Sequence, residues 1–247
     1  MASTLAIAAV FVCWTIIALP CALPTVVLHG LWPSVMRRAN RRLIWLYGRI
    51  ALFFLRPWMP VRMGRPDLAV RLPRSIILPN HQSFLDLYLL SAQNQPNVCM
   101  VTKGWPFRLL FFFAPSMRGA GYVNAEALSP KAVEELCLQR LQEGATLVIF
   151  PEGRRSRDGS LGRFHSGAFR VAVKAQVPVL PLLIRNTFRI FPPGGKSFSP
   201  APIEMEFLDP VHPQDFAAEL LPHRAMLRRA RALFLPHLQS LTTDEES

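Results

Sequence analysis

The chain has 247 residues, of which 51% are apolar, and its 28 lysines and arginines outnumber 16 aspartates and glutamates. This length allows one domain plus an anchoring segment, and the net charge of +12 indicates an anionic partner surface. No nucleic-acid motif accompanies the charge, so we expect membrane lipids and no nucleic acid as partners.

The N-terminal 36 residues carry no charged side chain, and Leu5–Leu28 is long enough to cross a bilayer core of about 30 Å. Pro20 and Pro24 interrupt this stretch, so the sequence leaves open whether it spans the bilayer as a transmembrane helix or lies in one leaflet. An arginine cluster follows: Arg37, Arg38, Arg41 and Arg42. By the positive-inside rule, we expect the rest of the chain on the cytoplasmic side of a membrane, the bacterial inner membrane.

A second apolar segment, Leu43–Leu55, is rich in aromatic residues. We expect an amphipathic helix in the membrane interface, with arginines at the headgroups and Trp45, Phe53 and Phe54 in the acyl layer. A hydrophobic helix packed on the folded domain is the alternative. Residues 1–58 are therefore predicted to be an N-terminal hydrophobic membrane-anchoring helical segment.

Beyond a connector rich in proline and arginine at 56–74, apolar runs typical of strands alternate with segments typical of helices. We expect strands near 75–79, 97–102, 120–123, 146–150, 178–184 and 203–208. We expect helices near 84–93, 105–114, 130–142, 164–175 and 215–233. The alternation predicts an α/β domain over residues 59–240, with a central mixed sheet flanked by helices, followed by a polar tail at 241–247.

The strand expected near 75–79 ends in the turn Asn80-His81-Gln82-Ser83-Phe84-Leu85-Asp86. With His81 in the turn and Asp86 in the first turn of the next helix, the carboxylate can reach back to the ring. A carboxylate on one imidazole nitrogen fixes the tautomer and leaves the other nitrogen free to take a proton from a hydroxyl. The same spacing forms a capping box, with Ser83 as N-cap, so a purely structural role stays open.

A second polar turn, Phe150-Pro151-Glu152-Gly153-Arg154-Arg155-Ser156, follows another expected strand, and Val177-Pro178-Val179-Leu180-Pro181 comes behind it. Polar turns at the carboxyl ends of strands are where open α/β sheets bind ligands. The three blocks together resemble those of the glycerolipid acyltransferase family, which includes the 1-acylglycerol-3-phosphate acyltransferases. The first block matches N-H-x-S-x-x-D in full, the second matches F-P-E-G-T-R-S except at Arg154, and the third matches V-P-[IV]-x-P.

The resemblance implies acyl transfer from a thioester to a lipid hydroxyl, with His81 as general base and Asp86 orienting it. This family links the Glu152 block to the acceptor and the proline block to the acyl donor, which implies that Glu152 binds a glycerol hydroxyl. Arg154, Arg155 and Arg157 suit a phosphate or the phosphates of coenzyme A, with lipid headgroups as the alternative. The residues expected to bind substrates are Asn80, Ser83, Glu152, Gly153, Arg154, Arg155 and Pro178. Backbone amides near Ser83 or Gly153 are candidates for stabilising the oxyanion.

The chain departs from the family pattern at the acceptor side. Asn124 and Ala125 stand where the family has an acidic residue and an arginine that binds phosphate, and His165 stands where a lysine is frequent. Arg118 or Lys103 is expected to replace the missing cation. Lysophosphatidic acid is the default acceptor, and a lysolipid without a phosphate monoester, such as a lyso-ornithine lipid, is the alternative.

The predicted activity needs no cofactor, because acyl-CoA or an acyl carrier protein supplies the acyl group as a substrate. Neither the histidines nor the four cysteines have metal-ligand spacing, so we expect no metal site and no disulfide framework. Two other functions stay open: a non-catalytic membrane lipid-binding protein, and a hydrolase that uses His81 to activate water.

Overall fold

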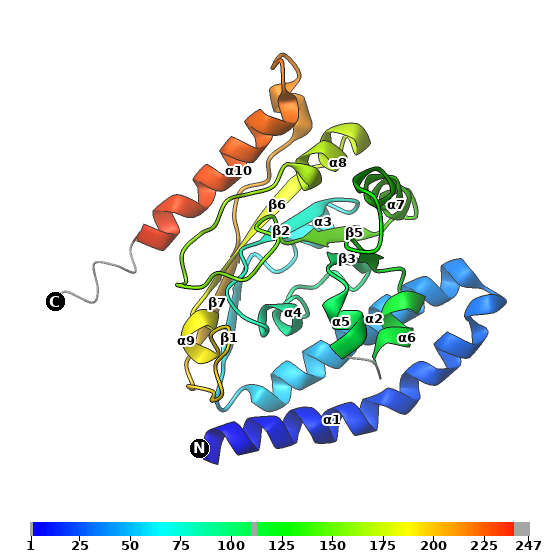
Figure 1. The fold of residues 1–247 in the computed structure, drawn as a ribbon, viewed down its shortest axis with the longest axis vertical. Helices are drawn as coiled ribbons and strands as arrows, with labels where there is room; N and C mark the ends of the chain where they lie inside the picture. The colour runs from blue at the N-terminus through cyan, green and yellow to red at the C-terminus, as the bar shows by residue number, and fades with distance from the viewer. Residues whose placement is uncertain (1, 110–112, 240–247) are drawn as a thin grey trace.

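The computed structural model describes residues 2–109 and 113–239, which form a seven-stranded sheet with helices on both faces (Figure 1). Along the sheet the strands follow the order β1-β7-β6-β2-β5-β3-β4. Their bounds are Val61–Gly64 (β1), Ile76–Pro79 (β2), Val98–Thr102 (β3), Val123–Asn124 (β4), Thr146–Ile149 (β5), Val179–Arg185 (β6) and Ile203–Phe207 (β7). The sheet is mixed, because every neighbouring pair is parallel except β6 and β7.

The helices are α1 (Ala2–Val27), α2 (Pro33–Leu55), α3 (Leu68–Arg71), α4 (Asp86–Leu89), α5 (Trp105–Leu109), α6 (Ala114–Gly119), α7 (Pro130–Gln142), α8 (Gly167–Ala175), α9 (Thr187–Ile190) and α10 (Pro222–Gln239), with 3-10 turns at Leu28–Gly30 (η1) and Pro213–Phe216 (η2). Side chains of β2 alternate between the two faces of the sheet. Ile76 and Leu78 join a core with α7, α8 and α10, whereas Ile77 joins a core with α2 and α4. The predicted α/β class, with a central mixed sheet flanked by helices, is confirmed.

Several expected elements differ from the observed ones. The helix expected at 215–233 is replaced by η2 and by α10, which begins only at Pro222, and the strand expected at 120–123 is reduced to β4. The expected connector contains β1, an edge strand that pairs only with β7, and the short helix α3. The helix expected at 84–93 is reduced to the four residues of α4. The helix expected at 105–114 is divided between α5 and α6, with 110–112 outside the described residues, as is the expected tail at 241–247.

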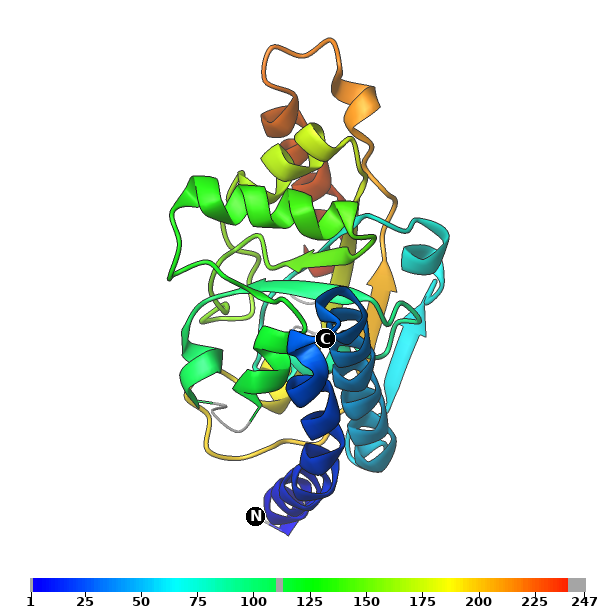
Figure 2. The same ribbon diagram turned by 90° about the vertical axis from the view of Figure 1, so that its right-hand side faces the viewer.

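The N-terminal segment forms two long helices, α1 and α2, which lie side by side and run in opposite directions (Figures 1 and 2). The helix α1 continues through Pro20 and Pro24. Within the described residues, no helix meets the length and hydrophobicity needed to cross a membrane. The predicted transmembrane span is therefore not confirmed.

The inner side of α2 packs on the α/β domain, in places where we expected membrane contacts. The Trp45 indole donates a hydrogen bond to the Gln93 carbonyl at 2.9 Å, so Trp45 is fixed to the domain. Arg41 is buried and donates from Nε to the Ala120 carbonyl at 2.8 Å. Only Phe53 and Phe54 of the three expected aromatic anchors lie on the exposed side.

Candidate functional site

The first polar turn leaves the centre of the sheet at the carboxyl end of β2, and Asn80 fixes it there. The Asn80 side chain donates to the Ile184 carbonyl at 2.9 Å and accepts from the Ile184 amide at 2.7 Å. Both polar atoms of this buried side chain are therefore occupied by the backbone of β6. Asn80 positions the turn, and the structure does not place it as an open substrate contact.

The expected contact between the histidine and the aspartate is present. His81 Nδ1 lies 2.8 Å from Asp86 Oδ2, and Asp86 is fully buried. The same oxygen accepts hydrogen bonds from the backbone amides of Gln82 and Ser83, at 2.7 and 2.9 Å. The carboxylate thus closes the turn and orients the ring at the same time. Since it can only accept from Nδ1, it selects the tautomer in which Nε2 carries the free lone pair.

The hydrogen bonds of the expected capping box are present, although the regular helix α4 begins only at Asp86. The Leu85 amide donates to Ser83 Oγ at 3.3 Å, and the Ser83 amide donates to Asp86 Oδ2 at 2.9 Å. The Ser83 hydroxyl also donates to the Phe191 carbonyl at 2.6 Å, which ties the turn to the segment after α9. The backbone amide of Ser83 is bound to Asp86, and that of Gly153 donates to the Phe150 carbonyl. Neither of these two amides is therefore free to stabilise an oxyanion in this conformation.

The second polar turn, at the carboxyl end of β5, holds the backbone of His81. Glu152 Oε1 accepts from the His81 amide at 2.9 Å, and Oε2 accepts from the Gly162 amide at 2.7 Å. The Ser156 amide donates to the His81 carbonyl at 2.7 Å. Burial raises the pKa of Glu152, and the two amide donors partly oppose that rise. The structure therefore uses Glu152 to position His81, whereas we expected a contact with a glycerol hydroxyl.

The loop after Glu152 presents several cations to solvent. Gly153 adopts a left-handed conformation with φ of +66°, which glycine tolerates best, and the exposed Arg154 and half-exposed Arg155 follow. Asp158 organises the loop by accepting hydrogen bonds from Ser156 and Ser160, which lower its pKa to about 2.

The remaining predicted residues lie at opposite ends of the parallel strands: Lys103 where the strands end, and Pro178 and Arg118 where they begin. Lys103 follows β3 at the edge where β2 and β5 end, so it lies on the same edge as His81. Pro178 precedes β6, and its carbonyl accepts from the amide of Ile76 at the edge where β2 begins. Arg118 lies near the end of α6, two residues before Ala120, whose carbonyl accepts from Arg41. Arg41 also donates to Asn97, which directly precedes β3, so Arg118 lies near the start of that strand. The structure therefore separates Pro178 and Arg118 from the histidine.

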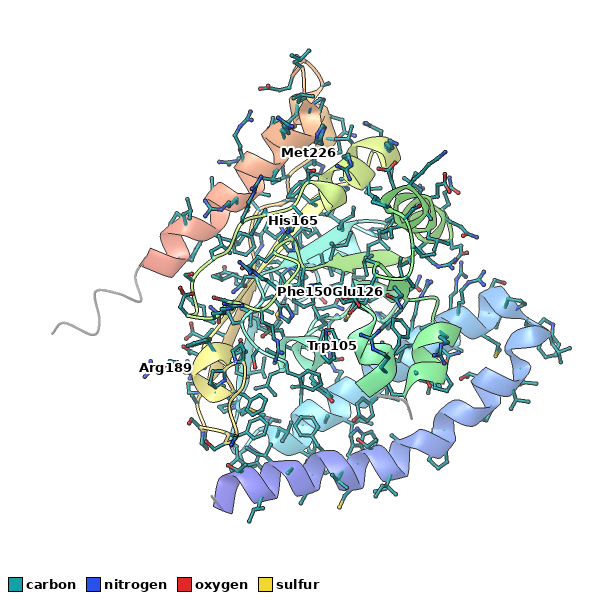
Figure 3. All side chains as sticks on the ribbon, viewed as in Figure 1. Trp105, Glu126, Phe150, His165, Arg189 and Met226 are labelled. Atoms are coloured by element: carbon teal, nitrogen blue, oxygen red, sulfur yellow. The ribbon has the colours of Figure 1, made fainter. Side chains whose placement is uncertain are left out.

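Several contributors were missed because their roles depend on tertiary contacts. The Phe150 ring lies against the imidazole of His81, with 4.1 Å between ring centroids, near the centre of the molecule (Figure 3). The Gln82 side chain donates to the Gly159 carbonyl and so joins the two loops at the site. Phe150 and Gln82 stand inside the two matched blocks, which is the only signal in the sequence that could have singled them out.

An apolar cavity of about 480 Å³ lies beside the histidine turn, between the N-terminal helices and the sheet. Phe84, three residues after His81, lines it together with Tyr88 of α4. The far wall comes from α1 and α2, including Thr15 and Tyr47, whose hydroxyls are 2.7 Å apart. The segment expected to be a helix at 105–114 contributes Pro106 and Phe113 to the lining, so part of it faces the cavity.

These residues form a site of the kind found in enzymes. An imidazole base, oriented by a carboxylate, lies at the carboxyl ends of the central strands, and the turn that carries it borders a cavity suited to an apolar chain. The described residues contain no group of three or more side chains that could hold a metal ion. Such a site is suited to chemistry at a hydroxyl and a carbonyl carbon.

Comparison with known proteins gives the family. The family model described as Acyltransferase matches residues 61–185, half of the chain, and the chain therefore belongs to the acyltransferase family. A chloroplastic 1-acyl-sn-glycerol-3-phosphate acyltransferase of Brassica napus is 36% identical over 124 residues, which are 49% of this chain and 36% of that protein. A Helicobacter pylori 1-acyl-sn-glycerol-3-phosphate acyltransferase is 31% identical over 120 residues, 47% of this chain and 50% of that protein. The chain thus spans half or less of the length of these relatives.

The fold has a counterpart among solved structures. The 1-acyl-sn-glycerophosphate acyltransferase PlsC of Thermotoga maritima superposes with a TM-score of 0.75 and 21% sequence identity. The match covers 97% of this chain and 96% of that one, so it includes α1 and α2 as well as the sheet.

Proposed function

We propose that the protein is a membrane-bound acyltransferase that moves a fatty acyl group from a thioester to the hydroxyl of a lysolipid. The default acceptor is 1-acylglycerol-3-phosphate, which gives phosphatidic acid in phospholipid biosynthesis. The observation that carries this proposal is the His81–Asp86 pair, in a turn whose Phe84 lines an apolar cavity. The names of the relatives support the acceptor.

The proposed reaction needs one base and no enzyme nucleophile. The acceptor oxygen attacks the thioester carbonyl carbon while His81 Nε2 takes the hydroxyl proton. Asp86 stabilises the imidazolium that forms. The new C–O bond replaces the C–S bond, and the departing thiolate takes the proton from the imidazolium, which regenerates the neutral base. All bonds and protons of the reaction are therefore accounted for without a cofactor.

The apolar cavity is the proposed place of the acyl chain. Its volume lies within the usual range for pockets that bury small molecules, about 300–1,000 Å³. The walls supplied by Phe84 and Tyr88 connect it to the histidine turn, while Thr15 and Tyr47 bound it on the side of the N-terminal helices. A chain in this cavity would bury apolar surface against these walls.

The acceptor headgroup is proposed to bind at the rim, near Lys103, Arg154 and Arg155. A second acceptor class, lysolipids without a phosphate monoester such as a lyso-ornithine lipid, has support from the sheet edge beside them. There the Asn124 side chain accepts from the Glu126 amide, and Ala125 supplies no cation. The phosphate contact of the family is missing at this position.

Membrane attachment is proposed to use the outer side of α1 and α2 without a span. Exposed apolar side chains lie on these helices and on the turn between them: Leu5, Ile17, Leu31, Trp32, Val35, Leu46, Phe53 and Phe54. A helix pair of this kind lies in one leaflet with its apolar side in the acyl layer. We place the catalytic domain on the cytoplasmic side of a bacterial inner membrane, from the arginine cluster that follows the apolar segment.

The test is acyl transfer by purified protein in lipid vesicles, with labelled acyl-CoA or acyl carrier protein as donor and a panel of lysolipids as acceptors. We expect transfer to lysophosphatidic acid that disappears in His81→Ala. Transfer only to acceptors without a phosphate monoester would move the function to the second acceptor class. Acyl release without an acceptor would indicate a hydrolase, and binding of lysolipid without any turnover would indicate a lipid-binding protein.

A further inference from the structure

The outer side of α10 carries a row of arginines. Arg224, Arg228 and Arg231 are spaced by four and three residues, which places them on one face of the helix. The opposite face buries Met226 and Phe234 in the core beneath α10. The arginine row therefore faces away from the domain.

These charges have no acidic partner in the described part of the chain: none of the three guanidinium groups forms an ion pair or hydrogen bond there. His223, at the start of the row, has its pKa lowered by burial and by the cations Arg170 and Arg224. Like charges four residues apart destabilise a helix. Because the row forms no ion pair with the described residues and its like charges repel, it does not stabilise the fold.

The helix that carries the row packs against the loop that holds the catalytic histidine. The ring of Phe234 contacts that of Phe164 edge to face, with 5.7 Å between centroids. The next residue, His165, donates its amide to the Pro151 carbonyl at 2.8 Å, directly before Glu152. The loop adds exposed cations of its own at Arg154, Arg157 and Arg163. We call these loop cations and the row on α10 the basic face.

The basic face lies away from the apolar side of α1 and α2. The helix α10 covers one face of the sheet together with α7 and α8, whereas α2 packs on the other (Figures 1 and 2). A bilayer that contacts Phe53 and Trp32 therefore lies on the other side of the sheet from Arg228. The partner that fits the basic face is a soluble anionic macromolecule.

From these observations we infer that the basic face is a docking surface for an acidic acyl carrier protein, which delivers the acyl thioester to His81. This inference rests on the proposed acyl transfer. Charge complementarity of this kind raises the rate of association and selects the partner. Acyl-CoA, a small donor, reaches the site without using the arginines of α10, so the two donors separate docking from chemistry.

The test compares Arg224→Glu/Arg228→Glu with a charge-matched control, Arg62→Glu/Arg71→Glu, whose arginines are also exposed but lie in β1 and α3. In vesicles at low salt, we expect the α10 variant to lose about tenfold or more in kcat/KM with palmitoyl acyl carrier protein as donor. Transfer from palmitoyl-CoA should stay unchanged, and the control should retain both activities.

Binding of fluorescent palmitoyl acyl carrier protein, measured by anisotropy without turnover, tests the surface independently. If the unaltered protein transfers from neither donor, the proposed function fails, while a weaker anisotropy signal in the α10 variant would still support docking. The inference would be overturned by equal losses with both donors or by loss of vesicle binding in the α10 variant. It would also be overturned if the unaltered protein did not bind the carrier protein, or if both variants kept that binding.

Discussion

Two buried carboxylates hold His81, one at its ring and the other at its backbone. Asp86 accepts from the imidazole and from two amides of the turn, while Glu152 accepts from the amide of His81 itself. Charge-assisted hydrogen bonds of this kind are short and directional, so they fix both the tautomer and the place of the base. Each carboxylate has a distinct consequence for the proposed reaction.

Replacing Asp86 by asparagine tests the ring contact. An amide NH₂ cannot accept from Nδ1–H, so the tautomer with a free Nε2 loses its preference. We expect Asp86→Asn to lower kcat by on the order of 10³- to 10⁴-fold, the size of the loss in a serine protease triad. The rate of acyl transfer in vesicles is the measurement, and thermal unfolding shows whether the variant folds. Activity within tenfold of the unaltered protein would contradict the role of Asp86.

Replacing Glu152 by glutamine tests the backbone contact. The amide NH₂ would face one of two N–H donors, those of His81 and Gly162, and lose that hydrogen bond. Displacement of the base should lower kcat by on the order of 10²-fold while the KM for the acceptor changes little. Glu126→Gln is a matched control, because Glu126 also accepts from a backbone amide, that of Gly104. If only the KM for the acceptor rose, Glu152 would instead bind the acceptor, as we expected from the sequence.

The raised pKa of Glu152 also predicts how stability depends on pH. The folded protein binds this proton more tightly than the unfolded chain, whose glutamates titrate near pH 4.3. As pH rises from there through the raised folded-state pKa, this group therefore lowers the free energy of unfolding. Glu152→Gln lacks the titration, so the stability of the parent relative to the variant should fall over this window and then level off. Denaturant unfolding between pH 4 and pH 8 provides the measurement.

How far the site follows from the sequence depends on the distance over which each contact acts. The His81–Asp86 pair was predictable, because five residues across a junction of turn and helix bring the two groups together. The partners of Glu152 were not, since Oε1 and Oε2 bind amides 71 and 10 residues away. Pro178 matched a motif, but the parallel pairing of β6 with β2 places it at the opposite edge of the sheet.

Among the helices, the contact of α2 with α4 and the turn after it sets one wall of the apolar cavity. Gly48 of α2 allows this close approach, because a Cβ there would lie 2.1 Å from Ser91 Oγ and 2.8 Å from Ser91 Cβ. Both residues line the cavity. The separation of the two segments is therefore limited by one glycine and one serine.

We expect Gly48→Ala to destabilise the protein by about 1–3 kcal/mol, the usual effect of overpacking, although alanine itself favours a helix. Ser91→Gly removes the atoms that the new Cβ would meet, so the double variant Gly48→Ala/Ser91→Gly should regain most of the loss. Denaturant unfolding of the four proteins completes a double-mutant cycle. Additive effects of the two changes would show that the contact does not limit the approach of α2.

The helices and strands followed from the sequence where the apolar pattern was long. The strands β2, β5 and β6 are buried on both faces and were located within one residue at each end. The edge strand β1 was missed because its four residues pair with one neighbour and none of them is buried: three are half buried and Arg62 is exposed. The α4 helix was overestimated, because the apolar residues after Leu89 continue into turns that pack against α2.

Over the whole molecule, the apolar side of α1 and α2 and the basic face lie on opposite sides of the sheet, although α2 also carries exposed arginines at Arg38, Arg42 and Arg49. Exposed apolar side chains gather on α1, η1 and α2, whereas the basic face lies on α10 and the loop after Glu152. Composition alone could not show this separation, since a net charge of +12 gives no position. Part of the cluster that we expected at lipid headgroups is internal, because Arg37 pairs with Glu143 and Arg41 is buried.

Membrane binding through the apolar side is testable by removing two of its exposed aromatics, Trp32 and Phe53. Burying a large apolar side chain contributes about 1.5–3 kcal/mol, so Trp32→Ser/Phe53→Ser should weaken partition into vesicles by on the order of tenfold or more for each side chain. Leu220→Ser is the control, because Leu220 is 94% exposed but lies before α10, away from α1 and α2. Sedimentation with vesicles measures the bound fraction.

The two variants also separate the membrane contact from electrostatic attraction. Because the changed residues carry no charge, the loss in Trp32→Ser/Phe53→Ser should persist in neutral vesicles and at high salt, where attraction between charges is screened. Equal weakening in Leu220→Ser would mean that any exposed apolar residue contributes. A loss confined to anionic vesicles at low salt would show that the arginines, and not the apolar side of α1 and α2, make the membrane contact.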